Sequence, residues 1–410
     1  MKILQVTAWD SLGQQFNGYQ IHKALLGLGQ NSSMAVHRSG FSEPHIHQLG
    51  NRIIRKIDKY LLAIEQKLSL HAILPITGYA QYFADYYQQA DLIHLQLIHA
   101  ESFFSLFNLP IMSRQKKVVW TLHDPWILSG HCVYSLECDR WLTGCGECPD
   151  LTLSFPIKRD TTAFTWKLKH LIMHHSQIDL VVASQWMYQR VKQSPILSHL
   201  PCHIIPLGLD TNIFKPREKG KSRDRFNIPL EAQVLAFRYQ SAANSLKGWQ
   251  WLEKALIDLE IDKPTYLISF DNKGGMEKLK DKYEVIELGW VHDQDLLCDA
   301  MNATDIFVMP SLAESFGMMA VEAMACGTPV IAFKNTALSD VIQAPRAGIA
   351  VPYKNSQALA TAISDLLKDD CKRAQLSNEA LNLVRSEYDV NIYISRHIKL
   401  YESLINTPSN

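Results

Sequence analysis

The sequence predicts an α/β protein with two domains, each built on a doubly wound parallel sheet. Short apolar segments rich in β-branched residues alternate with longer helical patterns along the whole chain. At 410 residues the chain is too long for one ordinary core and suits two. A charged stretch without periodicity, 215–227, separates the two alternations. We therefore expect a first domain over 1–210 and a second over 211–389.

Each expected strand is a short apolar run that ends in polar or turn residues. A last helical pattern, about 390–406, follows a complete second domain, and we expect it to pack back on the first. Expected helices include Lys247–Leu259, 293–302 and Met318–Cys326. The strands expected in chain order are Lys2–Ala8, Asp91–Leu95, Lys117–Leu122, Asp179–Ser184, His203–Pro206, Val234–Arg238, Pro264–Phe270, Glu284–Gly289, Asp305–Met309, Pro329–Phe333 and Gly348–Val351.

Composition excludes several classes of protein. Hydrophobic residues make up 47% and charged residues 20%, as in soluble globular proteins. The 41 Lys and Arg balance the 41 Asp and Glu, so no global charge favours nucleic acid. The opening MKILQVTAWD is typical of a strand rather than a secretory signal, and no apolar run reaches the ~18 residues of a membrane span. We expect a cytoplasmic protein.

Two carboxylates follow the expected strand Asp305–Met309. Glu314 lies in the loop after it, and Glu322 lies about one turn into a helix that begins near Gly317. The start of that helix offers free backbone N–H groups and a positive dipole end to an anion. Glu314 could simply cap the helix while Glu322 faces solvent. The apolar neighbours of Glu322 instead favour a buried carboxylate with a ligand partner.

This segment resembles the Glu-x7-Glu signature of glycosyltransferase family 4, whose members are retaining enzymes of the GT-B fold. The resemblance continues through Gly327-Thr328-Pro329-Val330, 289–297 and 205–216, and in effect covers the chain. It implies two Rossmann-like domains with parallel sheets facing a central cleft. It also implies that Glu314 contacts the donor sugar and Glu322 the donor ribose. Further donor positions implied are Val291, Phe316, Gly317 and Met318.

Breaking a glycosyl–phosphate bond leaves a nucleoside diphosphate, whose charge positioned cations can stabilise in place of a metal. Lys247, before Gly248, is the expected cation and matches the Lys-Gly of the family. Arg238 either contacts the phosphate too or is only a charge at a strand end. The motif Asp293-Gln294-Asp295 is interpreted as a helix cap rather than a metal site. We expect no cofactor for catalysis.

The loop after the first strand contains Gly13, which would let the backbone approach a phosphate or an acceptor. The family usually has two adjacent glycines, and here Leu12 takes the first position. The location of a donor-binding loop is therefore predicted, and its geometry is not.

His123 and Asp124 end the strand Lys117–Leu122, again at a carboxyl end. With Trp126 and His131 they resemble a family 4 subgroup in which the first His lies beside the transferred sugar. We expect His123 to bond a sugar hydroxyl. Asp124 either orients His123 or binds acceptor, and His131 is a second acceptor candidate.

Four of the eight cysteines fall within seventeen positions, and the other four are isolated. Their number matches a closed tetrahedral zinc site, so we expect a structural zinc with His131 as a substitute ligand. Reduced thiols or disulfides are the alternatives. A zinc-ribbon module for nucleic acid is not supported, because basic and aromatic residues are sparse around the cluster. The expected ligands are Cys132, Cys138, Cys145 and Cys148.

A basic stripe is expected on a helix after residue 51. Its basic residues recur at i, i+3, i+4 and i+7, beside an apolar face. The default interpretation is a surface helix whose apolar face packs on the sheet. The alternative is loose contact with the inner face of the plasma membrane. The basic residues are Arg52, Arg55, Lys56 and Lys59, and the apolar ones Ile53, Ile57, Leu61, Ile64 and Leu68.

We therefore expect a retaining, metal-independent glycosyltransferase. It would move a hexose from a UDP- or GDP-sugar to a hydroxyl of a surface polysaccharide or lipid-linked glycan. The alternatives are a nucleotide-sugar epimerase, hydrolase or phosphorylase of the same fold, and a non-catalytic binder of sugar nucleotides. The sequence does not name the sugar or the acceptor, because variable loops make those contacts.

Overall fold

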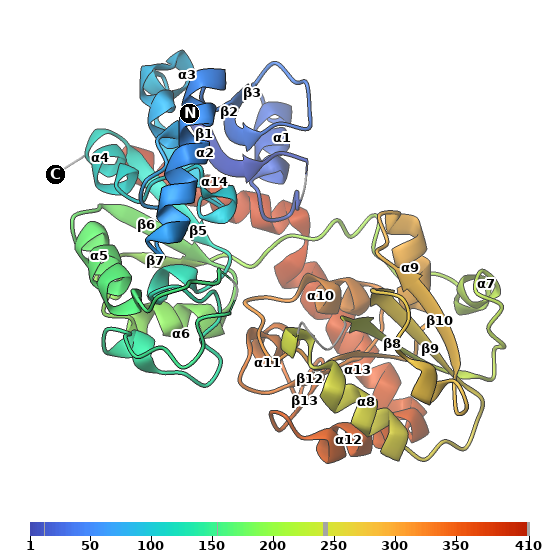
Figure 1. The fold of residues 1–410 in the computed structure, drawn as a ribbon. Helices are drawn as coiled ribbons and strands as arrows, with labels where there is room; N and C mark the ends of the chain where they lie inside the picture. Colours follow the sequence, from blue (N-terminus) through green and yellow to red (C-terminus); the bar gives the residue numbers. More distant parts are fainter. Residues whose placement is uncertain (12, 154, 241–244, 408–410) are drawn as a thin grey trace. The chain divides into compact units, whose positions relative to one another are not determined.

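The structure, a computed structural model, describes residues 1–11, 13–153, 155–240 and 245–407. Two compact units divide the chain (Figure 1). Unit 1 comprises Met1–Ile205 and Ile394–Asn410, and unit 2 comprises Pro206–Tyr393. Each unit is an α/β fold around one parallel sheet, as the alternating pattern predicts.

The sheet of unit 1 has the order β3-β2-β1-β4-β5-β6-β7, and every neighbouring pair is parallel. The chain crosses over between β1 and β4, so loops from both halves meet at the carboxyl ends of these strands. The strands are β1 (Lys2–Trp9), β2 (Asn31–Arg38), β3 (Ile46–Gln48), β4 (Leu92–Leu95), β5 (Lys117–Leu122), β6 (Ile178–Val182) and β7 (Cys202–Ile204).

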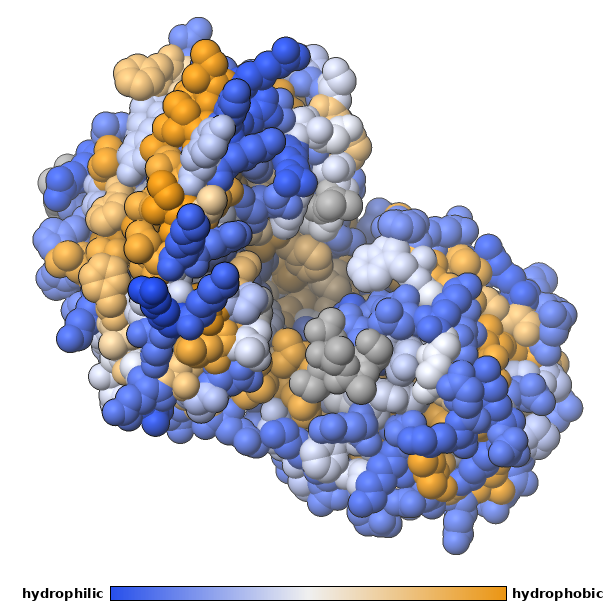
Figure 2. Space-filling view, viewed as in Figure 1, coloured by the Kyte–Doolittle hydropathy of each residue, from blue (hydrophilic) through white to orange (hydrophobic). Residues whose placement is uncertain are grey.

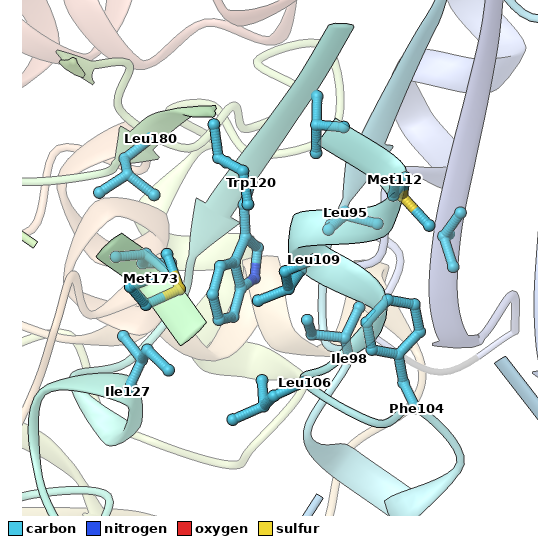
Figure 3. Packing of buried hydrophobic residues seen from close by; sticks show 14 of the residues in the cluster. Leu95, Ile98, Phe104, Leu106, Leu109, Met112, Trp120, Ile127, Met173 and Leu180 are labelled. Carbon is cyan, nitrogen blue, oxygen red and sulfur yellow. The ribbon is translucent and has the colours of Figure 1, made fainter. Parts of the chain in front are cut away.

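Helices and a large apolar core surround this sheet. Figure 3 shows Trp120 of β5 among leucine, isoleucine and methionine side chains from the neighbouring helices, strands and loops, and Trp120 is only 2% exposed. The indole Nε1–H donates to the Gln96 carbonyl at 3.2 Å, so the core fixes the loop after β4. The helices are α1 (Tyr19–Gly27), α2 (Arg52–Lys67), α3 (Asp85–Gln88), α4 (Asn108–Gln115), α5 (Thr162–His174), α6 (Gln185–Gln193) and, from residue 394, α14 (Val390–Asn406).

Unit 2 has the sheet order β10-β9-β8-β11-β12-β13, also parallel, with its crossover between β8 and β11. Its strands are β8 (Gln233–Tyr239), β9 (Thr265–Asp271), β10 (Glu284–Gly289), β11 (Ile306–Met309), β12 (Val330–Phe333) and β13 (Ile349–Val351). Its helices are α7 (Lys219–Asp224), α8 (Trp249–Asp258), α9 (Gln294–Ala303), α10 (Met318–Ala325), α11 (Ala337–Val341), α12 (Ser356–Lys368) and α13 (Asp370–Leu383).

The sequence prediction missed two strands of unit 1, β2 and β3. β2 begins Asn-Ser-Ser, which does not read as a buried strand, yet Ser32 is only 4% exposed. The Ser32 hydroxyl lies 2.9 Å from His22 Nδ1, so a side chain of the preceding helix α1 satisfies it. The expected helix at Lys247 also begins later: residues Ser245–Lys247 form a 3₁₀ turn, and α8 starts at Trp249.

The orientation of α2 corrects a second expectation. Its apolar side chains do not pack on the sheet: Ile53 is 70% and Ile64 46% exposed. The acidic Asp58 and Glu65 face the protein instead. Within the described residues, no helix is both long and apolar enough to cross a membrane.

Candidate functional site

The charged residues predicted for donor binding meet at the crossover of unit 2. Lys247 follows β8 and Glu314 follows β11, and these strands are neighbours in the sheet. Lys247 Nζ lies 2.5 Å from Glu314 Oε1, and both side chains are mostly buried, at 16% and 12% exposure. The sequence places these residues 67 positions apart, and the topology brings them together.

The two loops that carry this pair are locked to one another. The Leu312 N–H donates to the Leu246 carbonyl at 2.8 Å. Gly248 adopts a φ of 71°, and a Cβ there would lie 1.9 Å from the Pro310 carbonyl oxygen. Only glycine permits this approach, so the Lys-Gly pair has a structural reason as well as a chemical one.

Glu322 is the second predicted carboxylate, and its burial is confirmed at 7% exposure. It lies on α10, whose first turn begins after Gly317 in the left-handed conformation. In the part of the chain that the structure describes, Glu322 Oε2 has no hydrogen-bond partner. Burial raises the pKa of Glu322 to about 7, against the opposing effect of the Arg238 guanidinium. A buried carboxylate with an open acceptor is costly unless a ligand donates to it.

Arg238 is held by an acidic partner. Its Nε and Nη2 lie 2.8 and 2.7 Å from Asp271 Oδ2, and the Gln240 amide donates to the same oxygen at 3.3 Å. Asp271, at the end of β9, was not singled out from the sequence, because a single Asp after a strand carries no distinctive signal. Part of the loop that follows Arg238, residues 241–244, lies outside the described residues.

The remaining residues predicted for donor binding differ in burial and in position. Phe316 is 3% exposed and its ring packs edge-on against Tyr388 at 5.5 Å, which leaves its backbone for a ligand. Met318 opens α10 and is half-buried. Val291 follows β10, at the same edge of the sheet as Lys247 but beyond β9. The cap interpretation is confirmed, since the Asp293 side chain accepts from the Asp295 N–H at 2.9 Å.

In unit 1, His123 follows β5 and lies at the carboxyl end of the sheet. Its Nε2 lies 2.8 Å from Gln96 Oε1, and the Gln96 amide donates to Gln5 Oε1 at 3.2 Å. An amide oxygen only accepts, so the His123 Nε2 carries the proton. Burial lowers the pKa of His123 to about 4, which keeps the ring neutral at neutral pH.

This chain of contacts continues into the C-terminal helix. Tyr401 of α14 contacts His94 Nδ1 through its hydroxyl at 2.6 Å, and His94 Nε2 lies 2.7 Å from Thr121 Oγ1. The Gln5 amide also donates to the Tyr401 hydroxyl at 3.4 Å. Sequence reasoning missed Gln5, Gln96 and Tyr401, because isolated polar residues on strands and helices give no local signal.

The other candidates of unit 1 have structural partners. Asp124 Oδ2 lies 3.1 Å from His99 Nε2, and its Oδ1 accepts from the Trp126 N–H at 2.9 Å. Burial would raise the pKa of Asp124, but His99 and the Trp126 N–H outweigh it and lower the pKa. Gly13 has a φ of 61°, and its carbonyl accepts from the Phe16 N–H at 2.7 Å. Leu12 lies outside the described residues.

The four clustered cysteines line one small cavity together with His131. The Gly130 N–H donates to Cys145 Sγ at 3.3 Å, and His131 Nε2 lies 3.4 Å from Cys148 Sγ. Within 1–11, 13–153, 155–240 and 245–407, however, no three His, Cys, Asp or Glu side chains have the mutual placement of a metal site. The donor chemistry suits zinc, whereas the side-chain positions do not close around an ion. His131, a predicted acceptor residue, thus lines the cavity of the four cysteines.

A buried lysine, also missed from the sequence, lies beside these thiols. Lys169 is 0% exposed, and its Nζ donates to the Trp126 and Ser129 carbonyls at 2.8 Å each. Burial lowers the pKa of Lys169 to about 7, while Cys132 and Cys145 act in the opposite direction.

The two sheets and their crossovers define a two-domain protein of the Rossmann-like α/β class. Residues 238–369 match the family described as glycosyl transferases group 1. D-inositol 3-phosphate glycosyltransferase of Corynebacterium glutamicum is 31% identical over 200 residues, which cover 45% of this chain and 47% of that protein. The chain thus spans about half the length of the curated relatives it matches.

Solved structures show the same fold over the whole chain. Sucrose-phosphate synthase from Thermosynechococcus elongatus has a TM-score of 0.69 at 18% identity and covers 98% of this chain and 99% of its own. The Anabaena protein HepE, solved with UDP and glucose, has a TM-score of 0.66 at 18% identity, with 98% and 100% covered. The match to glycosyltransferases of the GT-B fold confirms the predicted fold class.

Proposed function

We propose that the protein is a retaining glycosyltransferase that moves a hexose from a UDP- or GDP-sugar to a hydroxyl of a surface polysaccharide or lipid-linked glycan. One observation carries the proposal: the crossover of unit 2 holds the Lys247–Glu314 pair and the buried, open carboxylate of Glu322. A nucleotide sugar offers what these groups lack, a diphosphate for the lysine and hydroxyls for the two carboxylates. The family match of residues 238–369 supports the same donor class.

The proposed transfer uses these groups in one step. The acceptor oxygen forms a bond to the anomeric carbon on the face from which the diphosphate departs, and the glycosyl–phosphate bond breaks. The acceptor proton passes to the leaving phosphate oxygen, so no protein base is required. Lys247 and the N–H groups at the start of α10 stabilise the charge on the diphosphate. Glu314 positions the sugar, and neutral His123 donates to or accepts from a sugar hydroxyl.

A thermal-shift panel of UDP- and GDP-sugars tests the donor. The right donor at 100 times its Kd stabilises the protein by about 2.7 kcal/mol, which raises Tm by a few degrees. Glu322→Gln should weaken that shift, whereas Glu379→Gln, at a partly exposed carboxylate of α13, should keep it. A panel without any shift would contradict the donor site. Consumption of donor without acceptor would indicate hydrolysis or epimerisation, and binding without consumption a non-catalytic binder.

The acceptor has a specific second candidate. The C. glutamicum relative and others are named as glycosyltransferases of D-inositol 3-phosphate. A competition assay with the identified donor separates the two classes, because a glycan acceptor and an inositol phosphate give products of different mass and charge. Transfer to inositol phosphate alone would replace the glycan acceptor while leaving the donor site intact.

The proposal includes a structural zinc with no catalytic role. Cys132, Cys138, Cys145 and Cys148 would hold it and fix the loop 132–148. Support comes from the four thiols around one cavity and from the adjacent Lys169, whose buried ammonium would be balanced by zinc-bound thiolates. Elemental analysis of the purified chain should give about one zinc per chain, and Cys145→Ser should abolish it. Cys371→Ser, at an exposed cysteine, is the control, and a metal-free wild-type chain would refute the site.

A further inference from the structure

Helix α2 of unit 1 has its polar and apolar faces exchanged relative to an ordinary surface helix. Its two acidic residues, Asp58 and Glu65, are only 3% and 1% exposed. Several of its large apolar residues are exposed, whereas Ile54, Leu61 and Leu62 are half-buried. An amphipathic helix normally buries its apolar stripe against the core, so this arrangement needs a cause.

The cause lies in the segment that follows the helix. Asp58 accepts from the N–H groups of Ile76 and Thr77 at 2.7 and 2.8 Å. Glu65 Oε1 accepts from the N–H groups of Ile73 and Leu74 at 2.6 and 3.0 Å. These four backbone donors lie in a loop without a strand partner, and the two carboxylates satisfy them. The inward face of α2 is therefore fixed by hydrogen bonds.

The outward face carries a continuous apolar stripe. Its members recur at i, i+4, i+7, i+11 and i+15, which places them on one side of a helix. Scattered exposed apolar residues are normal, but a stripe along the full length of a helix marks an interaction surface. Figure 2 shows apolar surface next to strongly hydrophilic side chains over the part of unit 1 where Figure 1 draws α2. The stripe consists of Ile53 (70% exposed), Ile57 (42%), Tyr60 (66%), Ile64 (46%) and Leu68 (50%).

The charge on the exposed side of α2 has one sign. Arg52, Lys56, Lys59 and Lys67 are exposed, and at 100° per residue all four fall on the same flank of the stripe. The only acidic residues of the helix are the buried Asp58 and Glu65. The opposite flank of the stripe turns into the protein. The surface thus combines an apolar strip with an uncompensated basic edge.

A groove extends this surface at the start of the helix. It has a volume of about 600 Å³ and is lined by Asn51, which caps α2, by Ile54 of α2 and by aromatic residues of the segment 76–86. Phe83, one of these, is 93% exposed. Exposed aromatic rings beside an amphipathic helix are typical of residues that insert at a lipid–water boundary.

We propose that the exposed face of α2 is a membrane-contact surface whose partner is an anionic lipid leaflet. The basic edge selects negative headgroups, and the stripe with Phe83 enters the boundary of the acyl chains. This surface does not depend on the donor site of unit 2. It would hold unit 1 at the membrane, where lipid-linked acceptors are found.

Vesicle flotation with the full-length chain tests the proposal. The wild type should float with vesicles of phosphatidylcholine containing 30% phosphatidylglycerol at low salt. It should not float with pure phosphatidylcholine, and 0.5 M salt should release most of it, because the Debye length falls below about 5 Å. Failure of the wild type to float with anionic vesicles at low salt would overturn the proposal.

Matched variants locate the contact. The triple change Lys56→Gln, Lys59→Gln, Lys67→Gln should lower the partition coefficient at least 10-fold. The triple change Lys167→Gln, Lys254→Gln, Lys263→Gln removes the same charge from exposed lysines elsewhere and should change the partition coefficient less than twofold. An equal fall of the partition coefficient in the two triple variants would show an effect of total charge and overturn the assignment to α2.

Ile57→Ser with Ile64→Ser separates lipid from protein partners. It should reduce flotation while the far-ultraviolet spectrum and the sugar-nucleotide thermal shift stay unchanged, because both side chains are exposed. A wild-type dimer that these changes dissociate, without flotation, would make the face an interface between two copies and overturn the lipid assignment. A retained thermal shift shows that such a failure leaves the donor site unaffected.

Discussion

The two sheets share one crossover topology but place opposite kinds of polar groups there. At the crossover of unit 2, the polar groups are charged: the Lys247–Glu314 pair, Arg238 with Asp271, and Glu322. At the crossover of unit 1, the groups that hold His123 are neutral: His123, Gln96 and Gln5 bond to one another in sequence.

This difference predicts a separate role for each unit in the proposed sugar transfer. Buried charges that partly lack partners reduce stability in the free protein, and a charged ligand relieves that cost. A neutral network that satisfies itself gains little from a ligand, but it fixes the direction of the one ring it holds. Under the proposed function, we therefore expect unit 2 to supply binding energy for a diphosphate and unit 1 to orient the sugar.

The largest expected effect is on Lys247. Lys247→Ala should lower kcat by about 10²–10³-fold, because the leaving diphosphate loses its cation and Glu314 loses its partner. The measurement is transfer of labelled sugar at saturating donor. Lys278→Ala, which removes an exposed lysine paired with Glu253 at 3.4 Å, should stay within about twofold. A comparable fall of kcat in both variants would contradict a specific role of Lys247 in the transfer.

Glu322→Gln should reveal the cost of the buried charge. The folded pKa of about 7 exceeds the ordinary value of 4.5, so the folded state binds the proton more tightly. The free energy of unfolding of the wild type should fall as the pH rises from 4.5 to about 7, and it should fall no further above pH 7 on account of this group. The variant without donor should therefore match the wild type near pH 4.5 and exceed it by roughly 2–3 kcal/mol at pH 8.

Chemical unfolding of both proteins at the two pH values measures this difference, and the donor KM should rise about 10-fold in the variant. Glu379→Gln supplies the control, since its carboxylate is 37% exposed. A pH-independent difference would mean that Glu322 is not titrating in the folded protein.

Gln96→Leu tests orientation in unit 1. The His123 Nε2–H loses its acceptor, and kcat should fall about 10-fold with little change in donor KM, because a misplaced group costs rate rather than binding. Gln96→Glu keeps an acceptor oxygen and should recover part of the rate. Gln115→Leu, at an amide that accepts from Tyr87 in the same unit, should leave kcat unchanged. A rise in donor KM without a fall in kcat would contradict a positioning role.

The smallest effect is expected at the end of the network. Tyr401→Phe removes the hydroxyl that contacts His94, and it should lower the free energy of unfolding by about 1 kcal/mol. Tyr60→Phe, at a ring that is 66% exposed, should change it by less than about 0.3 kcal/mol. Equal values would show that α14 contributes no hydrogen bond to the core of unit 1.

Much of the molecule could be predicted from local sequence. The strands of unit 2 are short and bounded by turns, and all of them were predicted, because short apolar runs between helical patterns are typical of a parallel sheet. The Glu-x7-Glu segment fixed the positions of Glu314 and Glu322 along the chain, and the burial of Glu322 followed from its apolar neighbours.

The sequence by itself thus determined the fold class, the strand–helix alternation and the charged residues that meet at the crossover of unit 2. Only the tertiary structure decided that Ser32 lies in a buried strand, that Gln96 holds His123, and that α2 turns its isoleucines outward. Periodicity is a property of neighbours along the chain, and it shows that a helix has two faces. Which face is buried depends on distant groups, here the backbone N–H groups at 73–77 that Asp58 and Glu65 satisfy.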